Sequence, residues 1–216
     1  MTDGASPIWK PREVLHEGAE ATLTGGHWMG IPAVLKVRRS RSYRHPDLDK
    51  RLTKQRLTVE AKVLSKLSSL GFPCPSILLI DHNNSSILIS RIRGSPLYDL
   101  LKKGEAGTPE LRKLGHLIRR LHNLGISHGD LTTHNVMISN DKELHLIDFG
   151  LSRQSPELEH LGLDIQVLNE CLGASHSTIS DAIETVSEAY LEEESENARS
   201  VIDRFRKITG RVRYHG

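Results

Sequence analysis

The chain has 216 residues, a formal net charge of +2 and a hydrophobic fraction of 37%. That length suffices for one sizeable core, or for two small lobes, without disulfide bonds, and the near balance of charge excludes a protein that coats nucleic acid over its whole surface. The two cysteines, Cys74 and Cys171, form no C-x-x-C pair, which excludes a disulfide framework and a cysteine-based zinc site. The apolar runs are too short for a membrane span or a signal peptide. We therefore expect a cytoplasmic protein with no membrane partner.

The N-terminal part of the sequence alternates short apolar segments with one long helical pattern. Segments rich in aliphatic and β-branched residues predict four strands, over residues 21–23, 33–38, 76–81 and 86–92. The first two flank a turn-rich stretch from Gly25 to Pro32, so we expect an early β-hairpin. Between the two strand pairs, leucines at helical spacing predict a helix over 51–70 that ends at Gly71 and Pro73.

From Ser95 onward the pattern is mostly helical. Helices are predicted over 96–103, over 108–124 and from about residue 158 to the C-terminus. Two short strands, over 136–139 and 144–147, flank a turn between the second and third helical regions. The sequence thus predicts an α+β fold with two lobes, a small sheet with one helix over 1–93 and a helical lobe over 94–216.

A loop motif for phosphoryl transfer lies directly after the long helix and before a strand, in the sequence H128-G-D-L-T-T-H-N135. The spacing H-x-D-x-x-x-x-N in that context is typical of a kinase catalytic loop. Phosphoryl transfer needs a carboxylate that orients the attacking hydroxyl and oxygen ligands that hold Mg²⁺ on the phosphates. Asp130 suits the first role and Asn135 the second.

A second motif, I147-D-F-G150, follows the two-strand ribbon. We expect the ribbon to return Asp148 toward Asp130, where it would be the principal Mg²⁺ ligand. Alone, either motif could be an ordinary surface turn, but two kinase motifs in the correct order make coincidence improbable. The pair predicts a protein-kinase-like fold that binds ATP and Mg²⁺.

Lys36 ends the predicted strand A33-V-L-K36, the position from which a kinase lysine reaches the α- and β-phosphates. Glu60, in the helix that follows, is the natural carboxylate partner. Where a glycine-rich phosphate loop is expected, the chain offers only E17-G-A-E-A21. One glycine gives the backbone less freedom than G-x-G-x-x-G, and Glu20 would repel phosphates unless a metal or a lysine intervenes.

The segment after Asp148 is short and contains no A-P-E signature. A full protein kinase uses a longer activation segment and helical lobe to seat a peptide substrate. We therefore expect a truncated helical lobe, with the substrate supplied by a bound partner or with ATP turnover as the output.

The sequence resembles, over nearly its whole length, the small atypical Ser/Thr kinase subunits of the KEOPS complex, the family that includes the p53-related protein kinase. The resemblance rests on the two loop motifs, on E17-G-A-E-A21 and on the block Y43-R-H-P-D-L-D49. It implies a Mg²⁺-dependent kinase and ATPase that supports threonylcarbamoyladenosine formation in tRNAs reading A-starting codons. It also suggests an archaeal chain that is not fused to the transferase subunit.

Several residue roles are implied by this resemblance. Asp130 would be the catalytic base, Lys36 the phosphate-binding lysine with Glu60 as its carboxylate partner, and Asn135 and Asp148 the metal ligands. The strand end with Ser90 and Ile92 would be the hinge beside adenine. The remaining nucleotide contacts would come from the phosphate loop: Glu17, Gly18, Ala19, Glu20 and Ala21. The chain departs from the family pattern at two positions. The family often has an acidic residue in place of Ser90 and commonly a small residue in place of His134.

The implied partners are the threonylcarbamoyl transferase subunit and a small regulatory subunit. Two groups of basic residues are further candidates for phosphate contacts, although such groups are often simply solvated. They comprise Arg38, Arg39, Arg41 and Arg44, and near the C-terminus Arg204, Arg206, Lys207, Arg211 and Arg213. In the family a basic C-terminal tail is thought to engage tRNA, so tRNA is an expected partner.

Two other functions fit the same residues. A small-molecule kinase of the aminoglycoside or choline type also carries H-G-D followed by an asparagine, but it usually has additional helices that build a substrate pocket. A nucleotide-binding scaffold without turnover is the second, although such proteins normally lose one catalytic position and every position is filled here.

Overall fold

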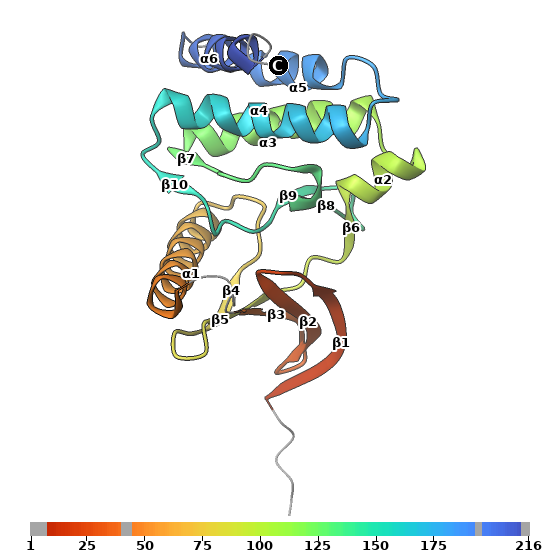
Figure 1. Cartoon of the computed structure of the whole chain (residues 1–216). Helices are drawn as coiled ribbons and strands as arrows, with labels where there is room; N and C mark the ends of the chain where they lie inside the picture. Colours follow the sequence, from red (N-terminus) through yellow and green to blue (C-terminus); the bar gives the residue numbers. More distant parts are fainter. Residues whose placement is uncertain (1–7, 40–44, 193–195, 213–216) are drawn as a thin grey trace, which may run out of the picture. The chain divides into compact units, whose positions relative to one another are not determined.

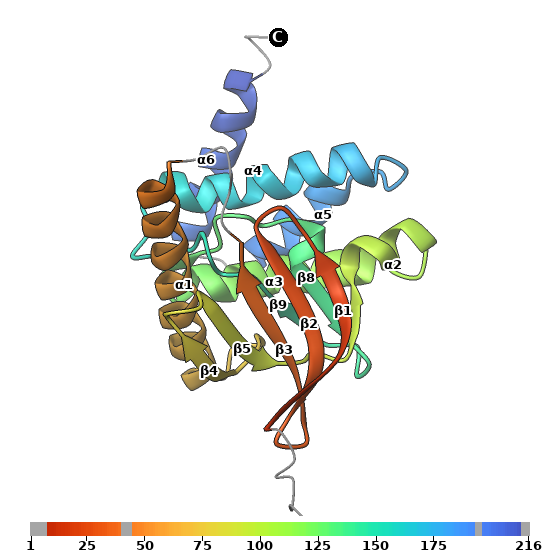
Figure 2. The same ribbon diagram turned by 60° about the horizontal axis from the view of Figure 1, so that its bottom comes forward.

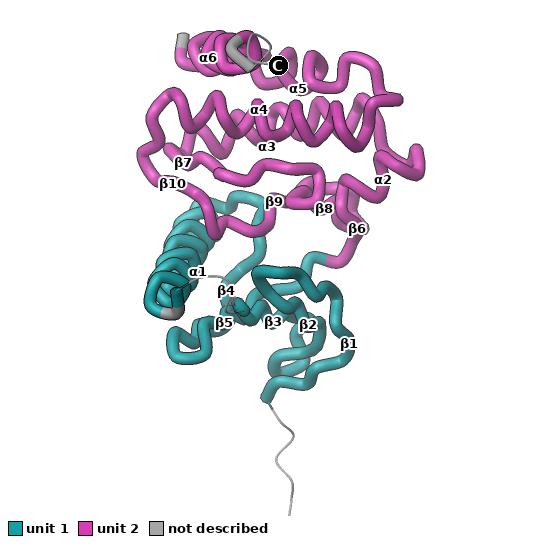
Figure 3. Tube along the Cα trace, viewed as in Figure 1, with its two compact units in different colours: residues 1–92 teal, residues 93–216 magenta. Residues whose placement is uncertain are grey.

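The computed structural model describes residues 8–39, 45–192 and 196–212. The chain divides into two compact units, residues 1–92 and residues 93–216 (Figure 3). Figure 1 traces the elements along the chain. Each unit is described by itself below.

Unit 1 is an antiparallel sheet with one helix. Its strands are β1 (Trp9–Glu17), β2 (Ala21–Trp28), β3 (Ile31–Arg38), β4 (Ile77–Asp81) and β5 (Ser86–Ser90), in the order β1-β2-β3-β5-β4. The helix, α1 (Pro46–Ser69), lies against β4 and β5 (Figure 2). Leu57, Leu64 and Leu67 of α1 are buried, as are Ile87 and Leu88 of β5. The expected sheet with one helix is therefore present.

The start of unit 1 differs from the sequence-based expectation. The glycines Gly25 and Gly26 lie inside β2, and the turn is at Met29 and Gly30, which have φ angles of 48° and 85°. A Cβ at Gly26 would lie 2.3 Å from the carbonyl oxygen of Lys10 in β1. The glycine is thus needed for the close approach of a neighbouring strand, not for a turn.

The strand β1 was not predicted. It is an edge strand whose residues are almost all exposed, so it lacks the alternation of apolar and polar residues that marks a half-buried strand. The helix α1 also begins earlier than expected, at Pro46, with Asp47 and Asp49 in its first turn. A proline at the first position and acidic residues near the N-terminus both favour a helix start there.

Unit 2 is mostly helical. Its helices are α2 (Leu97–Lys103), α3 (Thr108–Asn123), α4 (Leu158–Ser175), α5 (Ala182–Leu191) and α6 (Glu196–Val212), with a 3₁₀ turn, η1, over Thr133–Asn135. Its short strands are β6 (Gly94–Pro96), β7 (Ile126–Ser127), β8 (Val136–Ser139), β9 (Leu144–Leu146) and β10 (Arg153–Gln154). The strands form two small sheets, β6-β8-β9 and β7-β10.

The helices of unit 2 are arranged in pairs. α5 packs on α3, and α6 packs on α4, so α5 and α6 form the outer layer in Figure 1. Leu114, Ile118 and Leu121 of α3 are completely buried, as expected for one apolar face of an amphipathic helix. Within the described residues, every helix is too short or too polar to cross a lipid bilayer.

Candidate active site

The two motif loops of unit 2 meet at the end of the β8-β9 ribbon. The Asn135 side chain donates from Nδ2 to the backbone oxygen of Asp130 at 2.8 Å and to its Oδ2 at 3.1 Å. The backbone N–H of Ile147 donates to the carbonyl oxygen of Asn135 at 3.0 Å, so Asp148 follows directly after this contact. The structure therefore brings Asp130, Asn135 and the chain leading into Asp148 together.

His128 connects the same two loops through both ring nitrogens. Its Nε2 lies 3.0 Å from the carbonyl oxygen of Ile147, and its Nδ1 lies 3.3 Å from the backbone nitrogen of Asp130. A carbonyl accepts and an N–H donates, so the neutral tautomer with the proton on Nε2 satisfies both contacts. The side chain is completely buried, and this burial lowers the pKa of His128, against the opposing charges of Asp164, Asp148 and Asp130.

Two backbone conformations shape these loops. Gly129 has a φ of 82°, and a Cβ there would lie 2.2 Å from the carbonyl oxygen of Leu151, so only glycine fits. Asp148 also has a positive φ, 61°. Aspartate is among the few residues that tolerate this left-handed region, and strained residues of this kind concentrate at functional sites.

Asp164 of α4 holds the start of the catalytic loop, and the sequence analysis missed it. Its carboxylate accepts from the backbone N–H of His128 at 2.6 Å and of Gly129 at 2.8 Å. It is only 2% exposed. The available signal was an acidic residue on a helical face that is otherwise apolar, with Leu161, Ile165 and Leu168 as neighbours.

A second layer of buried polar groups supports Asp164. His122 of α3 lies 3.2 Å from its Oδ2 through Nε2 and 2.9 Å from the hydroxyl of Tyr190 of α5 through Nδ1. Burial raises the pKa of Tyr190, opposed by Arg119 beside it. On the other side, the Ser152 hydroxyl donates to the carbonyl oxygen of His128 at 2.9 Å. Buried groups joined in this way hold the loop in one conformation.

Unit 1 contains the expected lysine–glutamate pair. Lys36 Nζ lies 2.8 Å from Glu60 Oε1, and both residues are buried, with exposed fractions of 5% and 1%. Arg38 contacts the other carboxylate oxygen of Glu60 at 2.5 Å. The carboxylate is therefore shared by two cations that come from the same strand, β3.

The segment Glu17–Ala21, predicted to be the phosphate loop, forms the turn between β1 and β2. The N–H of Gly18 donates to the carbonyl oxygen of Ala21 at 3.0 Å, while Ala19 and Glu20 lie within the turn. Glu17 pairs with Arg39, and Glu20 pairs with Arg56 of α1 at 2.6 Å. The cation beside Glu20 is thus an arginine, where the sequence led us to expect a metal or a lysine.

The residues proposed as a hinge lie at the end of β5. The backbone N–H of Ser90 donates to the carbonyl oxygen of Ser76 at 2.8 Å, and its hydroxyl accepts from the N–H of Ser76 at 2.9 Å. Ser90 thus uses its own N–H within the sheet edge. Ile92 follows as the last residue of unit 1.

The oxygen groups at Asn135 and Asp148 fit Mg²⁺. The amide of Asn135 uses its nitrogen on Asp130, which directs its Oδ1 away from that contact. Mg²⁺ is usually held by one or two carboxylates together with phosphate oxygens. The described residues contain no cluster of three or more His, Cys, Asp or Glu side chains that could bind a metal.

His134 stacks on Tyr98 of α2, with ring centroids 3.7 Å apart and an interplanar angle of 23°. Its neighbour Thr133 bonds to His176 Nε2 at 3.1 Å through Oγ1. The turn that carries Asn135 is therefore supported by α2 on one side and by the end of α4 on the other.

The basic groups singled out in the sequence are only partly described. Arg38 and Arg39 are engaged in the ion pairs above, while Arg41 and Arg44 lie outside the described residues, as does Arg213. Arg204 pairs with Glu159 at 3.2 Å, and Arg206 lies 3.8 Å from Asp203. Lys207 is exposed on α6.

The burial of neutral His128 predicts a pH dependence of stability. Because its folded-state pKa is lowered, the unfolded chain takes up the proton first as the pH falls below about 6.5, the ordinary value for histidine. Stability is then fully present above that pH and declines below it. Chemical unfolding between pH 7.5 and 5.0 should show this decline, and His128→Gln should reduce it. His176→Gln is the comparison, since burial lowers the pKa of His176 as well; an unchanged decline in both variants would contradict the prediction.

Comparison with known proteins identifies the family. The model of the RIO domain matches residues 34–184. A solved structure, the Rio2 kinase-ADP/Mg²⁺-phosphoaspartate complex from Chaetomium thermophilum, has a TM-score of 0.63 at 18% identity, over 93% of this chain and 71% of that one. This likeness confirms the expected α+β, kinase-like fold.

Two groups of curated relatives are similar to the chain in sequence. The EKC/KEOPS complex subunit bud32 of Dictyostelium discoideum is 31% identical over 93% of this chain and 82% of that protein. The probable bifunctional tRNA threonylcarbamoyladenosine biosynthesis protein of Methanothermobacter thermautotrophicus is 33% identical over 99% of this chain. The chain spans only 39% of the length of that bifunctional relative. It belongs to the RIO domain family of atypical kinases and is homologous to the Bud32 subunits of KEOPS complexes.

Proposed function

We propose that the chain is a Mg²⁺-dependent, ATP-binding Ser/Thr kinase and ATPase that works as a KEOPS-type subunit and supports threonylcarbamoyladenosine formation in tRNAs reading A-starting codons. One observation carries the proposal. The side chain of Asn135 is hydrogen-bonded to that of Asp130, and the carbonyl oxygen of Asn135 accepts from the N–H of Ile147, the residue before Asp148. That arrangement gathers a base and two oxygen ligands, which is what phosphoryl transfer requires.

The motif residues of unit 2 divide this chemistry between them. Asp130 accepts the proton of the attacking hydroxyl or water and orients it. Asn135 and Asp148 would hold Mg²⁺, which would neutralise charge on the phosphate oxygens. The bond from Asn135 to Asp130 fixes the base relative to the metal ligand, and Asp164 keeps the loop in place through the backbone of His128 and Gly129.

In unit 1, Lys36 binds the phosphates of ATP, and Glu60 holds the lysine in position. The turn over 17–21 covers the phosphates, and Ile92 supplies a backbone contact to adenine. The ion pairs of Glu17 and Glu20 support this role, because they offset carboxylate charge that would repel phosphate.

The proposed partners are a threonylcarbamoyl transferase subunit, a small regulatory subunit and tRNA. The names of the relatives, a KEOPS complex subunit and a bifunctional threonylcarbamoyladenosine biosynthesis protein, support the first. The basic residues near the C-terminus are the basis for proposing tRNA, because such side chains contact phosphates.

The deciding experiment measures ATP turnover by the whole chain, alone and with the transferase subunit and tRNA. Turnover that requires Mg²⁺ and rises when both partners are present supports the proposal. Transfer of phosphate to small alcohols or aminoglycosides, with no response to the partners, would instead favour a small-molecule kinase.

Replacing Lys36 by methionine should lower kcat/KM for ATP on the order of 100-fold, the typical effect of removing one charged donor from an active site. The fold should persist, because Arg38 still neutralises Glu60. Lys62→Met, at an exposed position of the same helix as Glu60, is the matched control. Steady-state ATP hydrolysis separates the two, and similar rates for both variants would count against this role of Lys36.

A further inference from the structure

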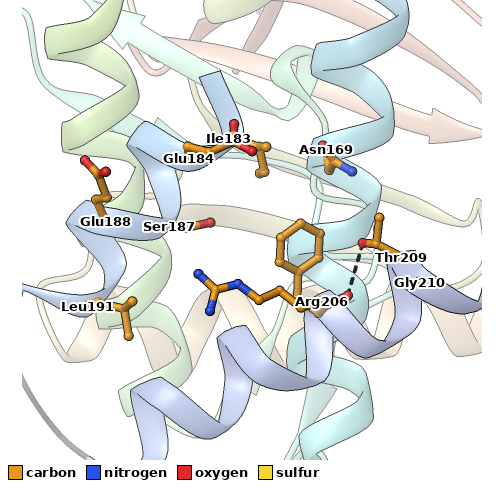
Figure 4. Close-up of a pocket in the computed structure, with 10 residues that line it drawn as sticks. Asn169, Ile183, Glu184, Ser187, Glu188, Leu191, Arg206, Thr209 and Gly210 are labelled. Atoms are coloured by element: carbon orange, nitrogen blue, oxygen red, sulfur yellow. Dashed lines mark hydrogen bonds between the residues drawn. The ribbon is translucent and has the colours of Figure 1, made fainter. Parts of the chain in front are cut away.

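A pocket of about 350 Å³ lies on unit 2, away from the motif loops (Figure 4). It is lined mainly by α5 and α6, with Asn169 of α4 at one side. The pocket exists because α5 packs on α3 whereas α6 packs on α4, so the facing sides of α5 and α6 are not packed closely together. Most of its lining follows residue 184, where the match to the RIO domain ends.

The lining has an apolar part. Phe205 is buried, and Ile183 and Leu191 of α5 are partly buried beside it. Gly210 of α6 leaves one wall open, since a Cβ there would meet no atom within 4 Å. A volume of this size with an apolar floor is at the lower end of the range for small-molecule sites.

Unpartnered polar groups also face the pocket. Ser187 is only 7% exposed, and its hydroxyl points into the pocket in Figure 4. Across the described part of the chain, neither Ser187 nor Asn169 has a side-chain hydrogen bond. Neither side chain has a fully buried polar atom that lacks a partner, so both groups are open to solvent and can bond to a ligand in the pocket.

Opposite charges stand on opposite walls. Glu184 and Glu188 come from α5 and Arg206 from α6. Among the described residues the two glutamates form no ion pair, and Arg206 lies 3.8 Å from the carboxylate of Asp203 on its own helix. No ion pair therefore joins the two walls within the described residues.

We propose that this pocket binds a small zwitterion, an α-amino acid with an apolar side chain. The ammonium group faces Glu184 and Glu188, the carboxylate faces Arg206, and the side chain lies on Phe205. Ser187 and Asn169 bond to the polar atoms of the ligand. A simple cation would leave Arg206 with only its long contact to Asp203, and a simple anion would be repelled by two glutamates, so a ligand with both charges fits the lining best.

The test is calorimetric titration of the full chain with L-leucine and L-valine. We expect a Kd of about 10 µM to 1 mM, the range for ligands of this size. N-acetyl-L-leucine lacks the ammonium group and isoamylamine lacks the carboxylate, so each should bind at least about tenfold more weakly, the effect of one lost charged contact. No binding of either amino acid, or equal binding of the blocked forms, would overturn the proposal.

Two variants tie the binding to this pocket. Gly210→Leu fills the open wall and should abolish binding, whereas Gly173→Leu, at an exposed helical glycine of α4 with equal space around it, should not. Both replace glycine in a helix, so neither should destabilise the fold. Ser187→Ala should weaken binding without lowering the thermal stability, because the hydroxyl has no protein partner. Binding that survives Gly210→Leu would place the ligand elsewhere and sink the assignment.

Discussion

Replacing Asp148 by asparagine is expected to reduce ATP turnover on the order of 1,000-fold, equivalent to about 4 kcal/mol of transition-state stabilisation. The substitution removes the charge that would hold Mg²⁺ on the phosphates. Asparagine is the variant of choice because Asp148 has a φ of 61°, and asparagine tolerates that conformation as well as aspartate does. The backbone of the loop should therefore remain as it is while the metal ligand is weakened.

The measurement is steady-state ATP hydrolysis as a function of Mg²⁺ concentration. Asp141→Asn, at an exposed position in the turn between β8 and β9, is the matched control and should behave as the wild type. If Asp148→Asn turns over ATP as fast as Asp141→Asn, then Asp148 is not the metal ligand. If it loses turnover but still supports threonylcarbamoyladenosine formation in the assembled complex, the chain acts there as a scaffold.

Replacing Asp164 by alanine is expected to destabilise unit 2 by about 3–5 kcal/mol, the usual result of removing a buried charged acceptor from its partners. The backbone N–H groups of His128 and Gly129 would lose bonds of 2.6 and 2.8 Å, and His122 would lose its contact at 3.2 Å. Asp164→Asn should also destabilise, because its amide group would direct a donor toward groups that are themselves donors.

Urea unfolding followed by far-ultraviolet circular dichroism is the suitable measurement. Both tryptophans of the chain, Trp9 and Trp28, lie in unit 1. Their fluorescence therefore reports on unit 1 and not on unit 2, which contains Asp164. Glu159→Gln is the control: it lies on the same helix as Asp164, loses only an exposed contact to Arg204 of α6, and should change the stability by less than about 1 kcal/mol. A value for Asp164→Ala in that same small range would show that the carboxylate does not hold the loop.

Local patterns were sufficient to predict most elements of the fold. The helix with Leu114, Ile118 and Leu121 on one face appears over Thr108–Asn123, because helical periodicity is a property of neighbouring residues. The edge strand β1 escaped prediction, since nothing in its exposed, polar sequence marks a strand. Pairing with β2, not its own composition, makes it one.

The proximity of Asp130, Asn135 and the Asp148 loop could also be expected, because a short ribbon joins the two motifs. The closeness of Lys36 and Glu60 followed from the order of a strand and the next helix. Asp164, Tyr190 and the use of the Ser90 amide by Ser76 could not be derived in this way. Each depends on which distant element packs against the loop, and hydrophobic spacing alone does not specify that.

The sequence by itself determined the types of elements, their order and the identity of the chemical groups for phosphoryl transfer, because these depend on residues close together in the chain. Only the tertiary structure decided that a carboxylate of α4 anchors the backbone of His128, that this histidine is neutral, and that α5 and α6 leave a pocket with charged walls. Those features arise where segments far apart in sequence bury polar groups against one another, and a buried group must find its partner in whatever the fold places beside it.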